Sequence, residues 1–361
     1  MKLWKRAAAA IKDRKSLLAV GFSRRTSHHN LDLEAAIIKA TSHDSSSVDY
    51  SNAHRVYKWI RSSPHLNLKT LIHTLSSRVS HTRSWIVSLK SLMLLHGVIS
   101  CKLPSVLGEL RRLPFDLSDF SDGHSCLSKT WGFNIFVRAY YAFLRSYASF
   151  LSDQFHRRPV NRRSSVNQET ERIQKLQSLL DLILQIRPIA DNMKRTLILE
   201  AMDCIVIESI NIYGRICSGV IRMLPSSGKA DAAATLKIIN KATSQGEDLA
   251  VYFEFCKGFG VPNARDTPQF VSIPKAEVET IKNMIENVGE EEVVEEEKGM
   301  VVLEKPRLET IITEKWEIFE DDECCFHEKV IKEYQKHTLP LIVSYQEPVY
   351  IEYMMPDLIT F

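Results

Sequence analysis

Apolar residues recur at three- and four-residue spacing along most of the chain, and few stretches alternate apolar with polar residues. This spacing is typical of amphipathic helices. It predicts a first helix that opens near Leu33 with Asp32 as its N-cap. Further helices are expected at about 51–62, 67–79, 81–100, 104–112, 127–155, 168–187, 190–224 and 230–258. So many successive helices predict an all-α fold, a superhelical, solenoid-like stack rather than a four-helix bundle.

The segment 127–155 differs from the others because aromatic residues cover much of its circumference. They are Trp131, Phe133, Phe136, Tyr140, Tyr141, Phe143, Tyr147 and Phe150. A helix that is apolar nearly all round is typically buried, so we expect this one at the centre of the fold. After it, the run 157–165 is rich in arginine and predicts a basic surface loop.

Charge is divided unevenly along the 361 residues, although the whole chain carries only +3. Residues 1–272 hold 38 Lys and Arg against 22 Asp and Glu, a balance of +16, whereas residues 273–361 hold 9 against 22, a balance of −13. A body this basic suits an anionic partner, either nucleic acid or the cytoplasmic leaflet of a membrane. The acidic part, with its glutamate run at 290–297, is expected to be a solvated, partly disordered tail.

Composition excludes several classes of protein. The hydrophobic fraction of 44% and the charged fraction of 25% are ordinary globular values, which excludes wholesale disorder. The alanine run after Arg6 is too short for a secretory leader, and no long uncharged apolar run predicts a membrane span. The seven cysteines are scattered and lie mostly on apolar helical stretches, which favours buried, reduced thiols of a cytosolic protein.

Several motifs, in consistent order, resemble the ANTH/ENTH-domain family of clathrin assembly proteins. They are KATSH at 39–43, SWIVSLKSL at 84–92 with His96, Trp131 with FVRAY at 136–140, and CKGFGV at 256–261 followed by PQF at 268–270. Residues 273–281 resemble the plant branch of that family. The resemblance covers about residues 1–285, nearly the whole chain before the acidic tail.

This resemblance implies a helical superhelix that binds inositol phospholipids, including phosphatidylinositol 4,5-bisphosphate, and promotes clathrin coat assembly in endocytosis. The implied partners are the membrane, the clathrin heavy chain, an adaptor complex appendage and a vesicle SNARE. In the family the later helices hold the SNARE helix, which corresponds here to about residues 190–255. The implied location is the cytosolic face of coated pits and vesicles, at the plasma membrane or Golgi. No cofactor and no catalysis are implied.

The lipid site that the resemblance implies consists of several lysines and a histidine, from the end of one helix and the start of the next. Point charges arranged in this way suit a multivalent phosphate at a surface. Lys39 is present and His43 follows it. In the family a basic cluster follows the lysine after nine intervening residues, but an ungapped count places Asp49, Ser51 and Asn52 there. The aspartate would oppose a phosphate directly.

A two-residue insertion gives a second alignment of the same site. It brings His54 to the family's histidine with Arg55 beside it, but Ser51 and Ala53 then replace the lysines. In both alignments about two positive charges are lost. At ~1 kcal/mol per basic residue near an anionic surface, the headgroup site should be on the order of tenfold to a hundredfold weaker.

The N-terminus offers a second lipid-binding element. Residues 1–30 contain one acid, Asp13, and eight basic residues: Lys2, Lys5, Arg6, Lys12, Arg14, Lys15, Arg24 and Arg25. On a helix one face would carry Leu3, Trp4, Ala7, Ala8, Ile11 and Leu18. A basic amphipathic helix with an interfacial tryptophan is typical of a helix that lies in the headgroup plane. The alternative is an ordinary helix of residues 1–20 that docks on the body by its apolar stripe.

We therefore expect lipid contacts from two groups of residues. The first is the N-terminal group of Lys2, Lys5, Arg6 and Lys12. The second is the weakened pocket of Lys39, His43, His54 and Arg55.

Residues 50–100 contain seven Lys and Arg and no acid. These charges either extend the membrane-facing surface or lie on solvated faces of successive helices. Trp85 and His96 resemble core positions of the family. No P-loop, HExxH or paired CxxC motif occurs, which argues against an enzyme. Cys324 and Cys325 with His327 lack the usual metal-ligand spacing, so no metal site is expected.

Two short peptides in the tail resemble coat-binding motifs. Trp316 and Phe319, followed by acids, resemble a WxxF-acidic peptide for an adaptor appendage, although a chance pair in a structured helix is the alternative. Leu358, Ile359 and Phe361 resemble a clathrin box in which the chain's carboxylate replaces the usual acid. Apolar segments at 339–345 and 349–353 could dock the tail and hide both peptides.

Together these features predict two parts: residues 1–285 as an ANTH-like membrane-binding domain and residues 286–361 as an acidic tail. The leading function is a peripheral membrane adaptor without catalysis. The alternative is a helical scaffold that has lost phosphoinositide binding and acts only through protein partners. Nucleic acid is not an expected partner, because no reading module or aromatic single-strand platform is present.

Overall fold

The structure is a computed structural model that describes residues 10–18, 30–123, 127–156, 162–223, 232–264 and Glu279. Within these residues all regular structure is helical, which confirms the all-α prediction. After a helical segment at 10–18 come α2 (Leu31–Ala40), α3 (Tyr50–Ser62), α4 (Pro64–Thr82), α5 (Trp85–Ser100), α6 (Pro104–Glu109), α7 (Leu127–His156), α8 (Arg162–Leu184), α9 (Thr196–Met223) and α10 (Ala232–Phe259), with single-turn 3-10 helices η1 (Asp191–Met193) and η4 (Pro262–Ala264).

Helix ends are where the sequence-based prediction fails. The N-cap of α2 is Asn30, whose side-chain oxygen accepts a hydrogen bond from the Leu33 backbone N–H at 3.1 Å. Asp32, the expected cap, lies instead in the first turn, where an acid stabilises the helix dipole. Helix α8 begins at Arg162, so the basic loop predicted at 157–165 is partly helical.

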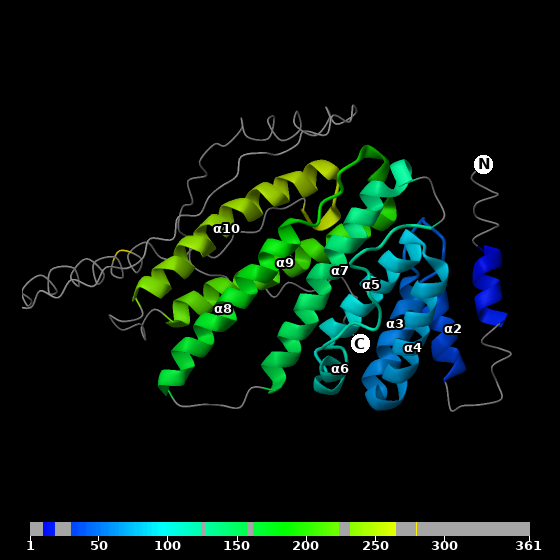
Figure 1. Cartoon of the computed structure of the whole chain (residues 1–361), viewed down its shortest axis with the longest axis horizontal. Helices are drawn as coiled ribbons and strands as arrows, with labels where there is room; N and C mark the ends of the chain where they lie inside the picture. The colour runs from blue at the N-terminus through cyan, green and yellow to red at the C-terminus, as the bar shows by residue number, and fades with distance from the viewer. Residues whose placement is uncertain are drawn as a thin grey trace, which may run out of the picture. The chain divides into compact units, whose positions relative to one another are not determined.

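The helices form two groups that α5 and α7 connect (Figure 1). Helices α2, α3 and α4 pack against one another, and so do α8, α9 and α10. Helix α5 contacts α3, α4, α7 and α9, and α7 in turn contacts α8. Neighbours in the chain are therefore neighbours in space, as a stack of helices requires.

The aromatic helix α7 lies in the core, as its sequence predicts. Phe136, Tyr140 and Phe143 are fully buried. The exceptions are at its two ends, where Trp131 is 50% exposed and Phe155 is 47% exposed. Two residues after Trp131, Phe133 stacks on Trp85 with ring centroids 4.1 Å apart, and this contact ties α7 to the start of α5.

His96 on α5 is a core residue, as the sequence suggests. Its Nδ1 lies 2.9 Å from the Tyr140 hydroxyl, and its Nε2 lies 3.5 Å from a carboxylate oxygen of Glu208. The Tyr147 hydroxyl donates to the other Glu208 oxygen at 2.7 Å. This buried network joins α5, α7 and α9 with its polar atoms paired, which is the normal requirement for polar groups in a core.

Among the described residues, α9 is the helix that is long and apolar enough to cross a membrane. More than half of its apolar window is buried against other parts of the fold. Core helices of globular domains have the same composition, so this property is weak evidence for a span.

Candidate membrane-binding site

The predicted lipid site begins at the turn between α2 and α3. The turn starts at Thr41, whose backbone N–H and hydroxyl both donate to the Ile37 carbonyl, at 3.0 and 2.7 Å. Thr41 and His43 are buried, whereas Lys39 is exposed in the last turn of α2. A basic side chain at this end of a helix is favoured by the helix dipole. Lys39 at the end of α2 therefore faces solvent, whereas the side chains of Thr41 and His43 in the turn face inward.

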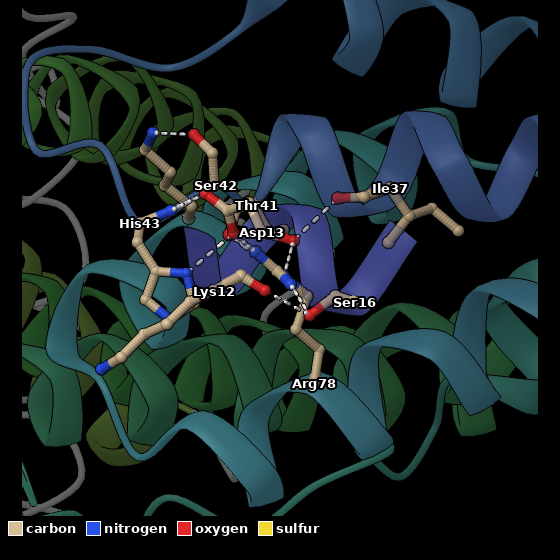
Figure 2. A network of polar contacts seen from close by, with 9 residues as sticks. Lys12, Asp13, Ser16, Ile37, Thr41, Ser42, His43 and Arg78 are labelled. Carbon is tan, nitrogen blue, oxygen red and sulfur yellow. Dashed lines mark hydrogen bonds and ion pairs between the residues drawn. The ribbon is translucent and has the colours of Figure 1, made fainter. Parts of the chain in front are cut away.

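A polar network joins the helical segment 10–18 to this turn (Figure 2). One carboxylate oxygen of Asp13 accepts a hydrogen bond from the His43 backbone N–H at 3.0 Å. The other oxygen lies 2.7 Å from His43 Nδ1 and 2.5 Å from Arg78 Nη2. We call Asp13, His43 and Arg78 the clamp. Because charge-assisted bonds are stronger than neutral ones, the clamp gives this contact both affinity and direction.

Arg78 is held rigidly within the clamp. Its Nε donates to the Thr41 hydroxyl at 2.8 Å, its Nη2 donates to the Thr41 carbonyl at 2.9 Å, and its Nη1 donates to Ser16 Oγ at 3.3 Å. The side chain is only 3% exposed. Its planar fork satisfies the neutral acceptors Thr41 and Ser16 and the half-buried carboxylate of Asp13 together, which a lysine could not do.

The carboxylate of Asp13 is ionised in this setting. Burial raises its pKa, but hydrogen bonds from His43 and Arg78 and the charge of Arg78 together lower the pKa below its ordinary value. The group is therefore charged at neutral pH, and its charge is compensated inside the protein rather than by solvent.

His43 is the predicted lipid ligand whose surroundings are most unlike an open headgroup site. Its ring is buried, and its Nδ1 is directed at Asp13. Its Nε2 is also buried and has no hydrogen-bond partner among the described residues. In this arrangement His43 binds the N-terminal segment, and contact between its ring and a headgroup stays a prediction.

Asp49 has a local structural role at the start of α3. It is the N-cap of that helix, and its side chain accepts hydrogen bonds from the Asn52 backbone N–H at 3.0 Å and from Asn52 Nδ2 at 2.7 Å. Such a cap satisfies orphan N–H groups of the first turn. The helix end that could otherwise receive a phosphate is thus already occupied by the chain's own carboxylate.

His54 and Arg55 are both exposed on the first turns of α3. The guanidinium of Arg55 lies 5.1 Å from the Trp59 ring centroid, and its Nη1 donates to Asn52 Oδ1 at 3.3 Å. The cation–π contact orients Arg55 along the helix surface. Arg55, like His54, is therefore accessible to solvent, as the alignment with the two-residue insertion requires of a lipid ligand.

The clamp joins two segments that each carry a predicted lipid-binding residue, Lys12 on residues 10–18 and Lys39 at the end of α2. Lys12, next to Asp13, is exposed, and in Figure 2 its side chain points away from the polar network. Lys39 is exposed two residues before Thr41, which binds Arg78. The other expected ligands Lys2, Lys5 and Arg6, and the tail residues Trp316, Phe319, Leu358, Ile359 and Phe361, lie outside the described residues.

Three residues of the site were not expected from sequence: Asp13, Arg78 and Lys90. Lys90 is 1% exposed, donates to Ser42 Oγ at 3.1 Å, and has a pKa lowered by burial. Arg78 and Lys90 are therefore buried residues that hydrogen-bond Thr41 and Ser42 of the turn, and neither extends the surface charge of residues 50–100. One signal for Asp13 was present, because it is the single acid among residues 1–30.

Other chemistry is scarce in the part of the chain that the structure describes. It contains no group of three or more metal-ligating side chains. Cys101, Cys204, Cys217 and Cys256 are free thiols, and burial raises the pKa of Cys217 to about 11. These thiols are therefore protonated and poorly nucleophilic at neutral pH. Cys126 and the Cys324, Cys325 and His327 group lie outside the described residues.

The all-helical fold agrees with what comparison with known proteins shows. The family model of the ANTH domain matches residues 32–287, and the chain belongs to this family. It is 73% identical to the Arabidopsis thaliana protein named "Putative clathrin assembly protein At1g68110" and 63% identical to "Putative clathrin assembly protein At1g25240", with both chains covered in full. A third Arabidopsis protein, "Putative clathrin assembly protein At1g14686", is 44% identical over 80% of this chain and 84% of its own.

Proposed function

We propose that this chain is a non-enzymatic peripheral membrane adaptor that binds inositol phospholipids and clathrin and promotes coat assembly and vesicle budding in endocytosis. Membership of the ANTH-domain family, and full-length similarity to proteins named as clathrin assembly proteins, support the coat function. The observation that carries the membrane part is the clamp, which fixes a basic N-terminal segment beside the turn that presents Lys39.

The lipid-binding surface consists of exposed bases on two joined segments. Lys12, Arg14 and Lys15 are exposed on residues 10–18, Lys39 is exposed at the end of α2, and Arg55 is exposed on α3. Bases near an anionic bilayer contribute ~1 kcal/mol each, so a few of them bind an anionic leaflet without a formed pocket. We infer that general charge contributes more than headgroup recognition.

The position of Asp49 favours one alternative. Its carboxylate caps α3, and the ring of His43 binds Asp13, so two positions of the family's headgroup site serve the fold itself. A helical scaffold that binds a vesicle SNARE or an adaptor, and no specific phosphoinositide, is the second candidate function.

The coat partners are assigned to the tail. We propose that Trp316 and Phe319 bind an adaptor appendage and that Leu358, Ile359 and Phe361 bind the clathrin heavy chain. A vesicle SNARE is proposed for residues 190–255. The location that follows is the cytosolic face of coated pits and vesicles, at the plasma membrane or Golgi.

Cosedimentation of the full chain with vesicles tests the membrane part. The vesicles are phosphatidylcholine alone, the same with phosphatidylserine, and the same with phosphatidylinositol 4,5-bisphosphate, each at low and high salt. We expect pelleting with both anionic compositions and its loss at high salt, because exposed charges are screened. Pelleting only with the bisphosphate would instead assign a selective headgroup site. No pelleting with any composition would favour the protein-only scaffold.

Charge reversals locate the surface. Lys12→Glu and Lys39→Glu should each weaken binding to phosphatidylserine vesicles by roughly tenfold or more. Lys237→Glu on α10 is the matched control, because Lys237 is exposed and far along the chain from the site. Equal losses in all three variants would show that only net charge matters.

Capture of purified clathrin and of an adaptor appendage domain by the full chain tests the coat part. Trp316→Ala with Phe319→Ala should abolish capture of the appendage alone. Leu358→Ala with Phe361→Ala should abolish capture of clathrin alone. Wild-type protein that captures neither partner would contradict the proposed function.

A further inference from the structure

The helical segment 10–18 has two distinct faces. Asp13, Ser16 and Leu17 are half-buried, and their spacing of three and four residues places them on one side of the helix. Ile11 and Leu18, seven residues apart, lie on the opposite side, and they are 56% and 60% exposed. The two members of the predicted apolar stripe that the structure describes therefore do not dock on the body, whereas Leu3, Trp4, Ala7 and Ala8 lie outside the described residues.

The directed contacts of this segment with the rest of the protein are hydrogen bonds and ion pairs of Asp13 and Ser16, with Leu17 half-buried beside them. Asp13 binds the backbone and ring of His43 and the guanidinium of Arg78, and Ser16 accepts a further bond from Arg78. An ordinary surface helix buries its apolar face and exposes its polar face. Here a carboxylate faces inward beside Leu17, while two other large aliphatic side chains, Ile11 and Leu18, face solvent.

The exposed face has the composition of a membrane-interface helix. Arg14 and Lys15 are exposed, and on a helix of 3.6 residues per turn they flank the line from Ile11 to Leu18. Apolar residues bordered by Lys and Arg insert shallowly while their charged ends stay with the headgroups. An anionic bilayer surface is thus the partner that fits this face.

We propose that the clamp is a positioning device for membrane binding, in which Asp13 holds the helix with Ile11 and Leu18 directed at the bilayer. This inference rests on the proposed membrane function and adds to it the orientation of the helix and the residue that sets it. Asp13 is a positioning residue, because its carboxylate is directed at His43 and Arg78 and away from the lipid-facing side.

For neutralisation of Asp13, the positioning role and simple charge attraction predict opposite changes in binding to anionic vesicles. Asp13 is an acid within a basic surface, so by charge alone its neutralisation would strengthen binding to anionic vesicles by up to roughly tenfold. If the clamp orients the helix, the same change weakens binding. Asp13→Asn tests this, because asparagine keeps the shape of the side chain and removes its charge.

The experiment measures partition of the full chain onto phosphatidylcholine–phosphatidylserine vesicles at low salt. Asp13→Asn is expected to weaken partition by roughly tenfold, and Asp13→Glu, which keeps the carboxylate, to restore part of it. Asp44→Asn is the matched control. Asp44 is exposed in the same turn as His43 and bonds the backbone and hydroxyl of Ser46, so its neutralisation should leave binding equal or slightly tighter.

A second pair of variants does not depend on the clamp. Ile11→Ser with Leu18→Ser should weaken partition to a similar extent without loss of stability, because both residues are exposed. Leu66→Ser on α4, where Leu66 is 77% exposed, is the control and should bind like wild type. This pair decides the question even if Asp13→Asn fails to fold.

The outcomes separate this inference from the proposed function. Wild-type protein that binds no anionic vesicle would contradict the membrane function, and the inference with it. Wild-type binding with unchanged or tighter binding of Asp13→Asn, or with unchanged binding of the Ile11 and Leu18 variant, would overturn the positioning role alone.

Discussion

The segment 10–18 and helix α10 are attached to the same fold by different kinds of contact. Helix α10 buries an apolar face that includes Leu249, Tyr252 and Phe253, all fully buried. The segment 10–18 leaves Ile11 and Leu18 exposed and is bound through the Asp13 carboxylate. One attachment is therefore made by apolar area and the other by a few directed, charged hydrogen bonds.

Because the two attachments differ in kind, salt, pH and single substitutions should affect their stability differently. Burial of apolar area is non-directional and almost independent of salt and pH. Hydrogen bonds to a buried charge depend on its ionisation and on a complete set of partners. Helix α10 should thus stay packed under all of these conditions. The N-terminal segment should detach when a single residue, Asp13, is substituted.

The largest expected effect comes from an apolar truncation in α10. Phe253→Ala should lower the free energy of unfolding by about 3–5 kcal/mol, because it removes a fully buried ring and leaves a cavity. Urea denaturation measures this loss. Val251→Ala, at a position 48% exposed on the same helix, should change stability by at most about 0.5 kcal/mol. Similar losses in both variants would contradict the packing described for α10.

A smaller loss is expected from the cation of the clamp. Arg78→Lys should cost about 2–3 kcal/mol, because an ammonium group cannot satisfy Thr41, Ser16 and Asp13 together. The same urea measurement applies, with the exposed Arg55→Lys as control. A change below about 0.5 kcal/mol for Arg78→Lys would mean that the clamp contributes little to the fold.

A buried polar contact of α10 should contribute less. The side chain of Gln245 donates to the Gln177 carbonyl at 2.7 Å and also bonds Asp181. Gln245→Ala should cost about 1 kcal/mol. Lys241→Ala, which removes an exposed ion pair to Asp181, should cost no more than about 0.5 kcal/mol. The reverse order of these two losses would contradict the burial assigned to Gln245.

The smallest effect is that of pH on the clamp within the working range. The pKa of Asp13 is lowered in the folded protein, so its stabilisation is complete above its ordinary pKa of about 3.9 and is lost as pH falls through the lower folded value. Cleavage near Leu17 by an acid protease should therefore rise only below about pH 4. In Asp13→Asn the cleavage should be high throughout and show no such step. A rise in the wild type already between pH 6 and 5 would contradict the assigned ionisation.

Within the part of the chain that the structure describes, the helical type of the long elements was predictable because apolar spacing records which faces are buried. The core positions of Tyr140 and His96 followed from the same spacing and from the family resemblance. Helix ends were less predictable: Asn30 and Asp32 are both good caps, and only the backbone geometry shows that Asn30 accepts the bond from Leu33. Single-residue choices of this kind differ by too little energy to be read from composition.

The exposed positions of the candidate lipid-binding residues could be predicted from sequence, but the hydrogen bonds beside them could not. Lys12, Lys39 and Arg55 are exposed, as a lipid-binding surface requires. The contact between Asp13 and Arg78 joins residues 65 positions apart, and no local pattern records such a pairing. The inward direction of the Asp13 face could not be deduced either, because a helical projection shows two faces without showing which one meets the body.

The most direct test of the account is hydrogen exchange of the full chain with and without phosphatidylserine vesicles. We expect added protection in residues 10–18, which the bilayer would cover, and unchanged exchange in α10. In Asp13→Asn this added protection should be lost. Protection by vesicles in α10 with none in residues 10–18 would contradict the assignment of the membrane surface to the clamped N-terminal helix.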